Sequence, residues 1–349
     1  MKEIRVGVIG LGFMGATHVS AYQAASKAGF ACKLVAVSDP KAHRRAGELG
    51  DVGGNIATGG ATERAFDPKI VRGYERAADL VADQEIDLVS ICTRTDTHAD
   101  LAATALKAGK HVLIEKPVAL TIGEIERIAI AAKESGKIAM PAMCMRYWPG
   151  WSWLKDRIDD KSLGKCVSAT FLRLASSPAW SRSFFLDGAK SGGALMDLHI
   201  HDADFVRWCF GRPMKVTSVG RRGPSGGIDH VTTAYEYDAS GPELVTAEGG
   251  FDHHPGFAFR MRFVAVFEKA TADFDLGRTP QLLLCRDGKS EAIATDLPSG
   301  YEGQVRALVS ALTSGNIMHL PTLSDAAAVT QLLEAERQSV IGRRSVELH

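Results

Sequence analysis

Five short apolar runs, separated by segments of helical length, dominate the first 143 residues. The runs cover residues 4–9, 33–38, 88–92, 111–114 and 137–140, and helices are expected to begin near Met14, Lys41, Ala77, His98 and Thr121. Strands that are apolar along their whole length are typical of parallel sheets covered on both faces by crossover helices. The sequence therefore predicts an α/β domain over residues 1–143 with a doubly wound parallel sheet, as in the Rossmann fold.

The pattern changes after Tyr147. One strand is expected at 166–174, and six more follow a helical segment at 192–211 without helices between them, at 215–221, 231–237, 244–249, 257–267, 271–274 and 281–285. Consecutive strands joined by short turns indicate an antiparallel sheet. Residues 144–349 are thus predicted to form an α+β domain with a large, mostly antiparallel open sheet. Its last helices, near 301–314 and 323–341, could pack back on the first domain.

Composition excludes several classes of protein. The 349 residues carry 41 Lys and Arg against 41 Asp and Glu, so no net field attracts nucleic acid or anionic lipid. The 6 cysteines form no C-x-x-C pair, no apolar run reaches the roughly 18 residues that span a bilayer, and strand 4–9 begins without a leader. We expect a cytoplasmic protein. An open sheet with one uncovered face predicts a homodimer or homotetramer through the C-terminal sheet.

Three glycines follow the first strand with the spacing of a dinucleotide-binding turn. Gly10-Leu-Gly12-Phe13-Met14-Gly15 lies between an apolar strand and a helix, the context in which a pyrophosphate binds at a helix N-terminus. Asp39 ends the second strand, where a carboxylate accepts hydrogen bonds from the adenosine ribose and repels a 2′-phosphate. This predicts NAD as the cofactor. NADP is the alternative, because Lys41, Arg44 and Arg45 follow at once.

Three motifs together resemble the glucose-fructose oxidoreductase, inositol dehydrogenase and rhizopine catabolism (Gfo/Idh/MocA) family. They are the glycine triplet, the stretch from Cys92-Thr93 through His98 to Glu115-Lys116-Pro117, and Gly192-Gly193 leading to Asp197-x-x-x-His201-x-x-Asp204. The sequence departs from the family at Arg94, where proline is usual, and at His199, where glycine is frequent. The resemblance implies cofactor contacts by Thr93, His98, Glu115 and Lys116. It also implies a substrate-contacting loop containing Arg146 and Trp148.

The segment 192–211 supplies the candidate chemistry. On one continuous helix Asp197 and His201, four residues apart, would share a stripe with Asp204 a turn further on. Oxidation of a secondary alcohol needs a base for the hydroxyl proton, and His201 is assigned as this acid/base. Lys116 is assigned to hold the reacting oxygen, and Asp197 to orient the substrate or the imidazole. Trp180 is a further candidate substrate contact in the polar loop that precedes this helix, and Asp204 is expected to be structural.

Other functions stay open at this point. His199 and His201 would lie about 200° apart on a helix, which argues against a shared metal ion, so no metal is predicted. The leading prediction is an NAD(P)-dependent oxidoreductase of a sugar, inositol or related polyol. The alternatives are an NAD-dependent glycoside hydrolase that uses transient oxidation and a sugar sensor without catalysis on the same fold. The conformation of the Gly-rich insertion at 51–67 is not assigned.

Overall fold

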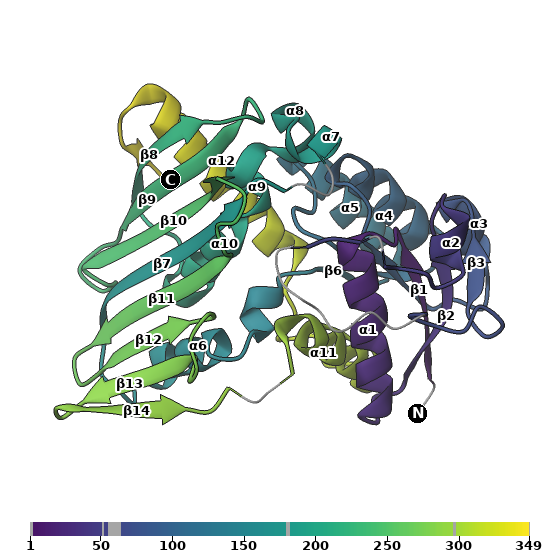
Figure 1. The fold of residues 1–349 in the computed structure, drawn as a ribbon, viewed down its shortest axis with the longest axis horizontal. Coiled ribbons are helices and arrows are strands. Elements are labelled where there is room, and N and C mark those ends of the chain that lie inside the picture. The colour runs from purple at the N-terminus through teal and green to yellow at the C-terminus, as the bar shows by residue number, and fades with distance from the viewer. Residues whose placement is uncertain (1–2, 51, 55–63, 179–181, 296–297, 349) are drawn as a thin grey trace. The chain divides into compact units, whose positions relative to one another are not determined.

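A six-stranded parallel sheet in the order β3-β2-β1-β4-β5-β6 forms the centre of the first part of the chain (Figure 1). Its strands are β1 (Ile4–Ile9), β2 (Cys32–Ser38), β3 (Arg72–Tyr74), β4 (Leu88–Ile91), β5 (His111–Ile114) and β6 (Ala139–Pro141). Every neighbouring pair is parallel. The predicted doubly wound sheet is confirmed. Strand β3 was not predicted because its three residues contain no apolar run.

Helices accompany this sheet in the expected alternation. They are α1 (Phe13–Lys27), α2 (Ala42–Arg45), α3 (Ala77–Ala82), the 3₁₀ turn η1 (Thr95–Thr97), α4 (His98–Lys107) and α5 (Ile122–Ser135). Helix α5 begins near Thr121, as predicted, and Thr121 and Glu124 form a capping box there. Helix α1 packs against α11 (Gly300–Ser314), and α4 packs against α5 (Figure 1). Because crossovers are right-handed and the strand order reverses direction after β3, α1 and α4 cover opposite faces of the sheet.

The structure is a computed structural model that describes residues 3–50, 52–54, 64–178, 182–295 and 298–348. It divides into two units. Unit 1 contains Met1–Cys144 and Ser299–Ala327, and unit 2 contains Met145–Pro298 and Ala328–His349. Helix α11 thus belongs to the same unit as the parallel sheet. Within the described ranges, no helix combines the length and apolarity needed to cross a membrane.

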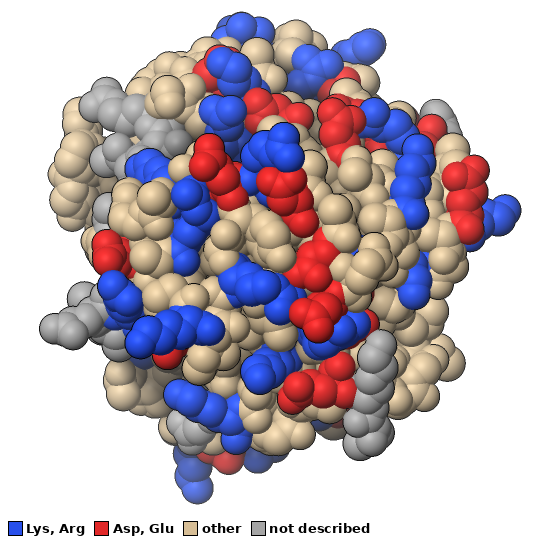
Figure 2. Space-filling view, turned by 90° about the vertical axis from the view of Figure 1, so that its right-hand side faces the viewer, with Lys and Arg blue, Asp and Glu red and all other residues tan. Residues whose placement is uncertain are grey.

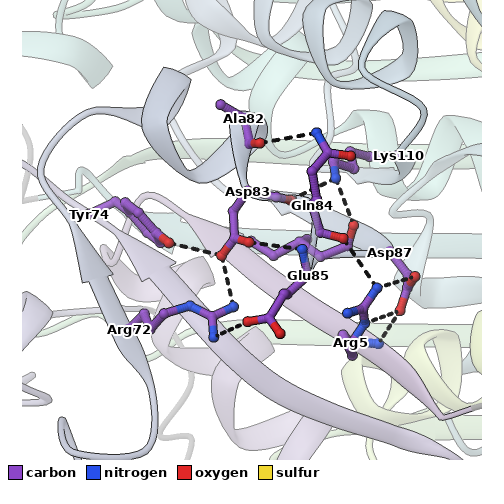
Figure 3. A network of polar contacts seen from close by, with 10 residues as sticks. Arg5, Arg72, Tyr74, Ala82, Asp83, Gln84, Glu85, Asp87 and Lys110 are labelled. Atoms are coloured by element: carbon purple, nitrogen blue, oxygen red, sulfur yellow. Dashed lines mark hydrogen bonds and ion pairs between the residues drawn. The ribbon is translucent and has the colours of Figure 1, made fainter.

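The amino ends of the parallel strands are held by a polar network (Figure 3). Arg5, at the start of β1, donates from Nε and Nη2 to the Asp87 carboxylate at 2.9 and 3.1 Å. Asp83 Oδ2 accepts from Arg72 Nη2 and from the Tyr74 hydroxyl of β3, at 2.7 and 2.8 Å. These contacts join the starts of β1, β3 and β4. The opposite, carboxyl ends of the strands carry the predicted cofactor residues.

Unit 2 is built on a nine-stranded sheet in the order β14-β13-β12-β11-β7-β10-β9-β8-β15 (Figure 1). Its strands are β7 (Cys166–Ser176), β8 (Lys215–Arg222), β9 (Ile228–Glu236), β10 (Leu244–His253), β11 (Arg260–Phe267), β12 (Thr271–Asp275), β13 (Leu282–Arg286), β14 (Lys289–Ile293) and β15 (Val346–Glu347). All neighbouring pairs are antiparallel except β7 and β10. This confirms the predicted, mostly antiparallel sheet.

One face of this sheet carries the buried core of unit 2. The helices of the unit are α6 (Trp151–Asp160), α7 (Arg182–Phe185), α8 (Gly188–Ser191), α9 (Gly193–Asp197), α10 (Ile200–Phe210) and α12 (Leu323–Gly342), whose first residues belong to unit 1. The Trp151 ring is fully buried, with its centroid 4.8 Å from that of Phe205 on α10 and 5.4 Å from that of Phe263 on β11. Aromatic packing therefore fixes α6 and α10 on the sheet.

Charges of both signs are mixed on one face of the molecule. The face drawn in Figure 2 shows Lys and Arg side chains interspersed with Asp and Glu side chains. No large region of a single sign is visible on that face. Nothing on this face therefore indicates a polyanion as partner.

Substitution of Lys110 tests how much the polar contacts at the amino ends of the strands contribute to stability. Its buried ammonium donates to the carbonyl oxygens of Asp83 and Ile86 at 2.7 and 2.9 Å. Lys110→Met leaves both carbonyls without this donor, so we expect the free energy of unfolding to fall by about 1–3 kcal/mol in urea titrations. The matched control is Lys107→Met in the exposed last turn of α4, with a change within about 0.5 kcal/mol. Equal effects of the two substitutions would contradict this role.

Candidate functional site

The three glycines of the first turn have different tasks. Gly10 has φ +85°, a left-handed conformation that favours glycine. A Cβ at Gly15 would lie 1.8 Å from the Gly10 carbonyl oxygen, so only glycine lets α1 start this close to β1. At Gly12, by contrast, no described atom lies within 4 Å of a Cβ. Gly10 and Gly15 shape the turn, and Gly12 leaves space in front of the helix N-terminus.

The amino end of α1 can accept an anion. Gly12 is its N-cap, and within the described chain no side chain caps it and no acidic residue lies in the first turn. The first backbone N–H groups of a helix lack intrahelical acceptors and carry the positive end of the helix dipole. The space beside Gly12 therefore fits the pyrophosphate of a dinucleotide, with Phe13 and Met14 in the first turn.

Asp39 lies at the carboxyl end of β2, beside this turn. Its side chain is buried, and Oδ2 accepts from the Leu11 backbone N–H at 2.9 Å while Oδ1 accepts from the Lys41 backbone N–H at the same distance. Arg45 donates to the Asp39 and Pro40 carbonyl oxygens. The carboxylate thus ties the glycine turn to the end of β2, where the adenosine ribose binds in this fold.

A second buried carboxylate, Glu115, follows β5. Its Oε1 lies 2.8 Å from His18 Nε2 on α1, and its Oε2 accepts from the Lys116 backbone N–H at 3.2 Å. The other ring nitrogen of His18, Nδ1, lies 3.2 Å from Ser90 Oγ of β4. The side-chain amide nitrogen of Gln304 on α11 lies 3.4 Å from His18 Nε2. Glu115 therefore fixes the backbone at Lys116 relative to α1 and β4.

His98 connects the loops that follow β4 and β5. Its ring nitrogens lie 2.9 Å from the Pro117 carbonyl oxygen and 3.1 Å from the Thr93 carbonyl oxygen. Burial lowers the pKa of His98, and the two carbonyl contacts offset only part of that effect. The ring is thus a buried support for Thr93 and for the Lys116–Pro117 segment. Lys116 itself is partly exposed at the carboxyl edge of the sheet.

The predicted single helix over 192–211 is two helices in the structure. Helix α9 ends at Asp197 and α10 begins at Ile200, and the Leu198 and His199 amides both donate to the Ala194 carbonyl oxygen at 2.9 Å. Leu198 and His199 are both buried, although neighbours on a regular helix diverge by about 100°. The break lets both side chains point inward. The prediction of one continuous stripe containing Asp197, His201 and Asp204 was wrong.

Gly192 and Gly193 form the turn that leads from α8 into α9. Their φ values are +76° and +70°, so the chain turns from α8 into α9 through two left-handed residues. A Cβ at Gly193 would lie 2.8 Å from the Ile228 carbonyl oxygen at the start of β9. The glycine pair therefore allows α9 to approach the sheet.

Three polar side chains of 199–204 are buried in ion pairs within unit 2. Asp202 is held by Arg173 of β7 through Nε and Nη2 at 2.9 and 3.1 Å. Arg146 donates to the Asp204 carboxylate from Nη2 at 2.6 Å and from Nε at 3.0 Å. The third pair joins His199 Nε2 to Glu336 Oε2 of α12, at 2.9 Å. Burial alone would lower the pKa of His199, but the charge and hydrogen bond of Glu336 outweigh it and raise the pKa. These pairs anchor α10 to the sheet and to α12.

Asp197 and His201 differ from these neighbours in exposure. Both side chains are partly exposed, whereas His199, Asp202 and Asp204 are buried. Of the other predicted substrate contacts, Arg146 and Trp148 are buried, and Trp180 lies outside the described residues. Among the ionisable side chains of 197–204, burial therefore separates the three that are held in ion pairs from Asp197 and His201, which are partly exposed.

Two family models match most of this architecture. Residues 4–143 match the oxidoreductase family with an NAD-binding Rossmann fold, and residues 151–273 match the GFO/IDH/MocA C-terminal domain. The chain belongs to the Gfo/Idh/MocA family. Unit 1 accordingly carries this family's NAD-binding Rossmann domain, in agreement with the glycine turn described above.

Several relatives of the chain are inositol dehydrogenases. The scyllo-inositol 2-dehydrogenase (NAD(+)) of Bacillus subtilis is 29% identical over 68% of this chain and 65% of its own length. For the myo-inositol 2-dehydrogenase of Thermotoga maritima the identity is 27%, over 61% and 56%. The chain thus spans less than two thirds of either enzyme. The inositol 2-dehydrogenase of Rhizobium meliloti is 25% identical over 99% of both chains.

Solved structures share the fold over the whole chain. A levoglucosan dehydrogenase in complex with NADH and levoglucosan has a TM-score of 0.81 at 20% identity, covering 99% of both chains. An oxidoreductase domain protein from Kribbella flavida has a TM-score of 0.81 at 23% identity, covering 100% of both. These likenesses show that both structures share the fold of this chain over its whole length.

Sequence reasoning missed the buried partners that support this Gfo/Idh/MocA site. His18 and Ser90 were not singled out, although a histidine on the buried face of α1 and a serine inside an apolar strand are both unusual. Arg173 is likewise a polar residue on the apolar side of β7, and Glu336 is a polar residue on the apolar side of α12. A polar residue at a position that the periodicity assigns to the core was the available signal.

The glycine turn yields a test with two opposite outcomes. Gly15→Ala forces a Cβ against the Gly10 carbonyl oxygen, so we expect loss of both stability and NAD binding. Gly12→Ala meets no described atom, so its melting temperature should stay near that of the parent while its Kd for NAD rises by about tenfold or more, because the methyl group occupies the place where the pyrophosphate approaches. Calorimetric titration with NAD and a thermal melt measure both. Unchanged NAD affinity in Gly12→Ala would contradict the assigned site.

Proposed function

We propose that this protein is an NAD(P)-dependent oxidoreductase acting on a secondary hydroxyl of a sugar, inositol or related polyol. The observation that carries the proposal is the partial exposure of Asp197 and His201, next to buried polar side chains that are held in ion pairs, in a chain with an NAD-binding domain. The names of the inositol dehydrogenase relatives support a cyclic polyol as substrate.

The proposed roles follow from the chemistry of alcohol oxidation. The bound nicotinamide would accept the hydride from the carbon that bears the hydroxyl group. His201 takes the hydroxyl proton as general base, and returns it in the reverse direction. Lys116 donates a hydrogen bond to the reacting oxygen and stabilises its developing negative charge. Asp197 orients the substrate or the imidazole of His201.

Supporting residues keep these groups in place. Glu115 holds the Lys116 backbone N–H, and His98 holds the Pro117 carbonyl oxygen, so the segment that carries Lys116 is fixed from both sides. In α10, the Asp202 and Asp204 ion pairs limit movement of the helix that carries His201. We assign Glu115, His98, Asp202 and Asp204 as positioning residues.

NAD is proposed as the physiological cofactor. The buried Asp39 carboxylate at the end of β2 supports this choice, because a 2′-phosphate would meet its negative charge. Arg44 Nη1 lies 4.0 Å from Asp39 Oδ2 and is the basic group that could favour NADP instead.

We further propose that the chain assembles as a homodimer or homotetramer through the open face of the nine-stranded sheet. Along β11, Met261, Phe263 and Ala265 are buried, whereas the alternate residues Val264 and Val266 are exposed. Val219 of β8 is 75% exposed. Exposed β-branched residues on a sheet face support burial against a second subunit.

The proposed reaction is tested by NADH formation. The purified protein is mixed with NAD, and separately with NADP, and with inositols, sugars, sugar acids and glycosides. We expect NAD reduction with at least one cyclic polyol. Lys116→Ala should lower kcat by about 10²–10³-fold while NAD still binds, because stabilisation of the developing alkoxide is lost. Lys107→Ala, in the exposed last turn of α4, is the matched control and should keep full turnover.

Three results would contradict the proposal. Full turnover in Lys116→Ala would remove this lysine from the reaction. Release of a free sugar from a glycoside without net NADH would indicate the hydrolase instead. Tight NAD and sugar binding without any turnover would indicate a sensor.

A further inference from the structure

A cluster of two imidazoles and a carboxylate lies on the nine-stranded sheet, at the ends of β9 and β10. His230 Nδ1 is 2.9 Å from Asp252 Oδ1, and His253 Nδ1 is 3.6 Å from the same oxygen. One ligand atom from each of the three residues lies within 4.8 Å of the other two. None of these residues takes part in the proposed oxidoreductase chemistry.

The backbone is shaped to bring these side chains together. Successive residues of a regular strand point to opposite faces, but β10 has a register shift against β7 between Gly250 and His253. This irregularity lets both Asp252 and His253 approach His230. Gly250 pairs with His230 across the strands, and a Cβ there would lie 2.8 Å from His230 Nδ1. The glycine leaves room for the imidazole.

The atoms of the cluster have the spacing of a zinc site. Tetrahedral zinc with Zn–N and Zn–O bonds of about 2.0–2.1 Å places its ligand atoms about 3.3 Å apart. The two measured separations from Asp252 Oδ1, 2.9 and 3.6 Å, bracket that value. His253 Nδ1 is buried and has no hydrogen-bond partner among the described residues. This nitrogen is therefore available as a metal ligand.

Neighbouring groups orient each of the three ligands. Glu248 Oε1 lies 3.0 Å from His230 Nε2, which is the carboxylate–imidazole arrangement found behind metal-bound histidines. Arg221 Nε holds Asp252 Oδ2 at 3.1 Å and leaves Oδ1 for an ion. The His253 ring stacks on Phe257 with a centroid distance of 4.1 Å. All three ligands are therefore fixed from outside the cluster.

We propose that His230, Asp252 and His253 form a binding site for a divalent transition-metal ion of the zinc type, separate from the nicotinamide chemistry. The ligands are His230 Nδ1, Asp252 Oδ1 and His253 Nδ1, and water completes the coordination. Binding replaces the proton that His230 Nδ1 shares with Asp252, so one proton is released and no oxidation or reduction takes place. Two imidazoles with one carboxylate suit zinc, and the outer carboxylate of Glu248 strengthens His230 as a ligand.

The test is a titration of the chelator-treated, full-length protein with Zn²⁺, followed by calorimetry. We expect one ion per chain in the parent protein. His253→Phe keeps the stacking on Phe257 but removes the ligand, and Asp252→Asn removes the anionic ligand. Both should weaken Zn²⁺ binding by at least about tenfold. His254→Phe, one residue further along and exposed, is the matched control and should bind Zn²⁺ like the parent.

Co²⁺ provides a second measurement that reports coordination directly. We expect the visible bands of four- or five-coordinate Co²⁺ with nitrogen and oxygen ligands, and their loss in His253→Phe. Far-UV circular dichroism and NAD binding of the variants verify that they are folded. Three results would overturn the proposal: no stoichiometric binding by the folded parent protein, equal weakening in His254→Phe and His253→Phe, or a thiolate-to-Co²⁺ charge-transfer band, which would assign the ion to a cysteine such as the exposed Cys285.

Discussion

Buried carboxylates paired with buried cations or imidazoles are the interaction on which both units depend. Glu115 contacts His18 in unit 1, and Asp202, Asp204 and Glu336 contact Arg173, Arg146 and His199 in unit 2. A carboxylate loses several kcal/mol of hydration when it is buried, so removal of its partner leaves a large uncompensated cost. Each pair therefore has one well-defined arrangement and fixes the elements that carry its members.

These pairs explain why only two of the ionisable side chains in the segment 197–204 are accessible to solvent. In the segment 197–204, three of the five ionisable side chains are buried against partners, and Asp197 and His201 are partly exposed. The break between α9 and α10 makes this division, because it turns Leu198 and His199 inward together. In unit 1, Glu115 and His98 fix the backbone on both sides of Lys116 in the same manner. The protein thus supports each proposed catalytic group on a rigid, buried polar frame.

Much of the fold followed from the sequence, because the apolar runs of 4–143 and the strand-rich pattern after Tyr147 have clear periods. The glycine turn and the capping box of α5 were also predictable, since each depends on residues close together in the chain. The helix break at Leu198 was not, because it depends on Phe251 and Glu336, which are distant in sequence. Arg146 and Trp148 are buried, and the pairing of Arg146 with Asp204 could not be read from spacing for the same reason. The cluster at His230 also escaped notice, because a strand irregularity assembles it.

Comparing variants of His201 and His199 tests most directly which of the two histidines is catalytic and which is structural. His201→Asn should lower kcat for NAD reduction by about 10²-fold or more and leave the free energy of unfolding within about 1 kcal/mol of the parent. His199→Gln should instead lower that free energy by about 3 kcal/mol, because Glu336 loses its imidazole partner, and kcat of the folded protein should change far less. Measuring both quantities on both variants decides the matter. Retained turnover in His201→Asn, or a loss of turnover in a fully stable His199→Gln, would contradict the division of roles by burial.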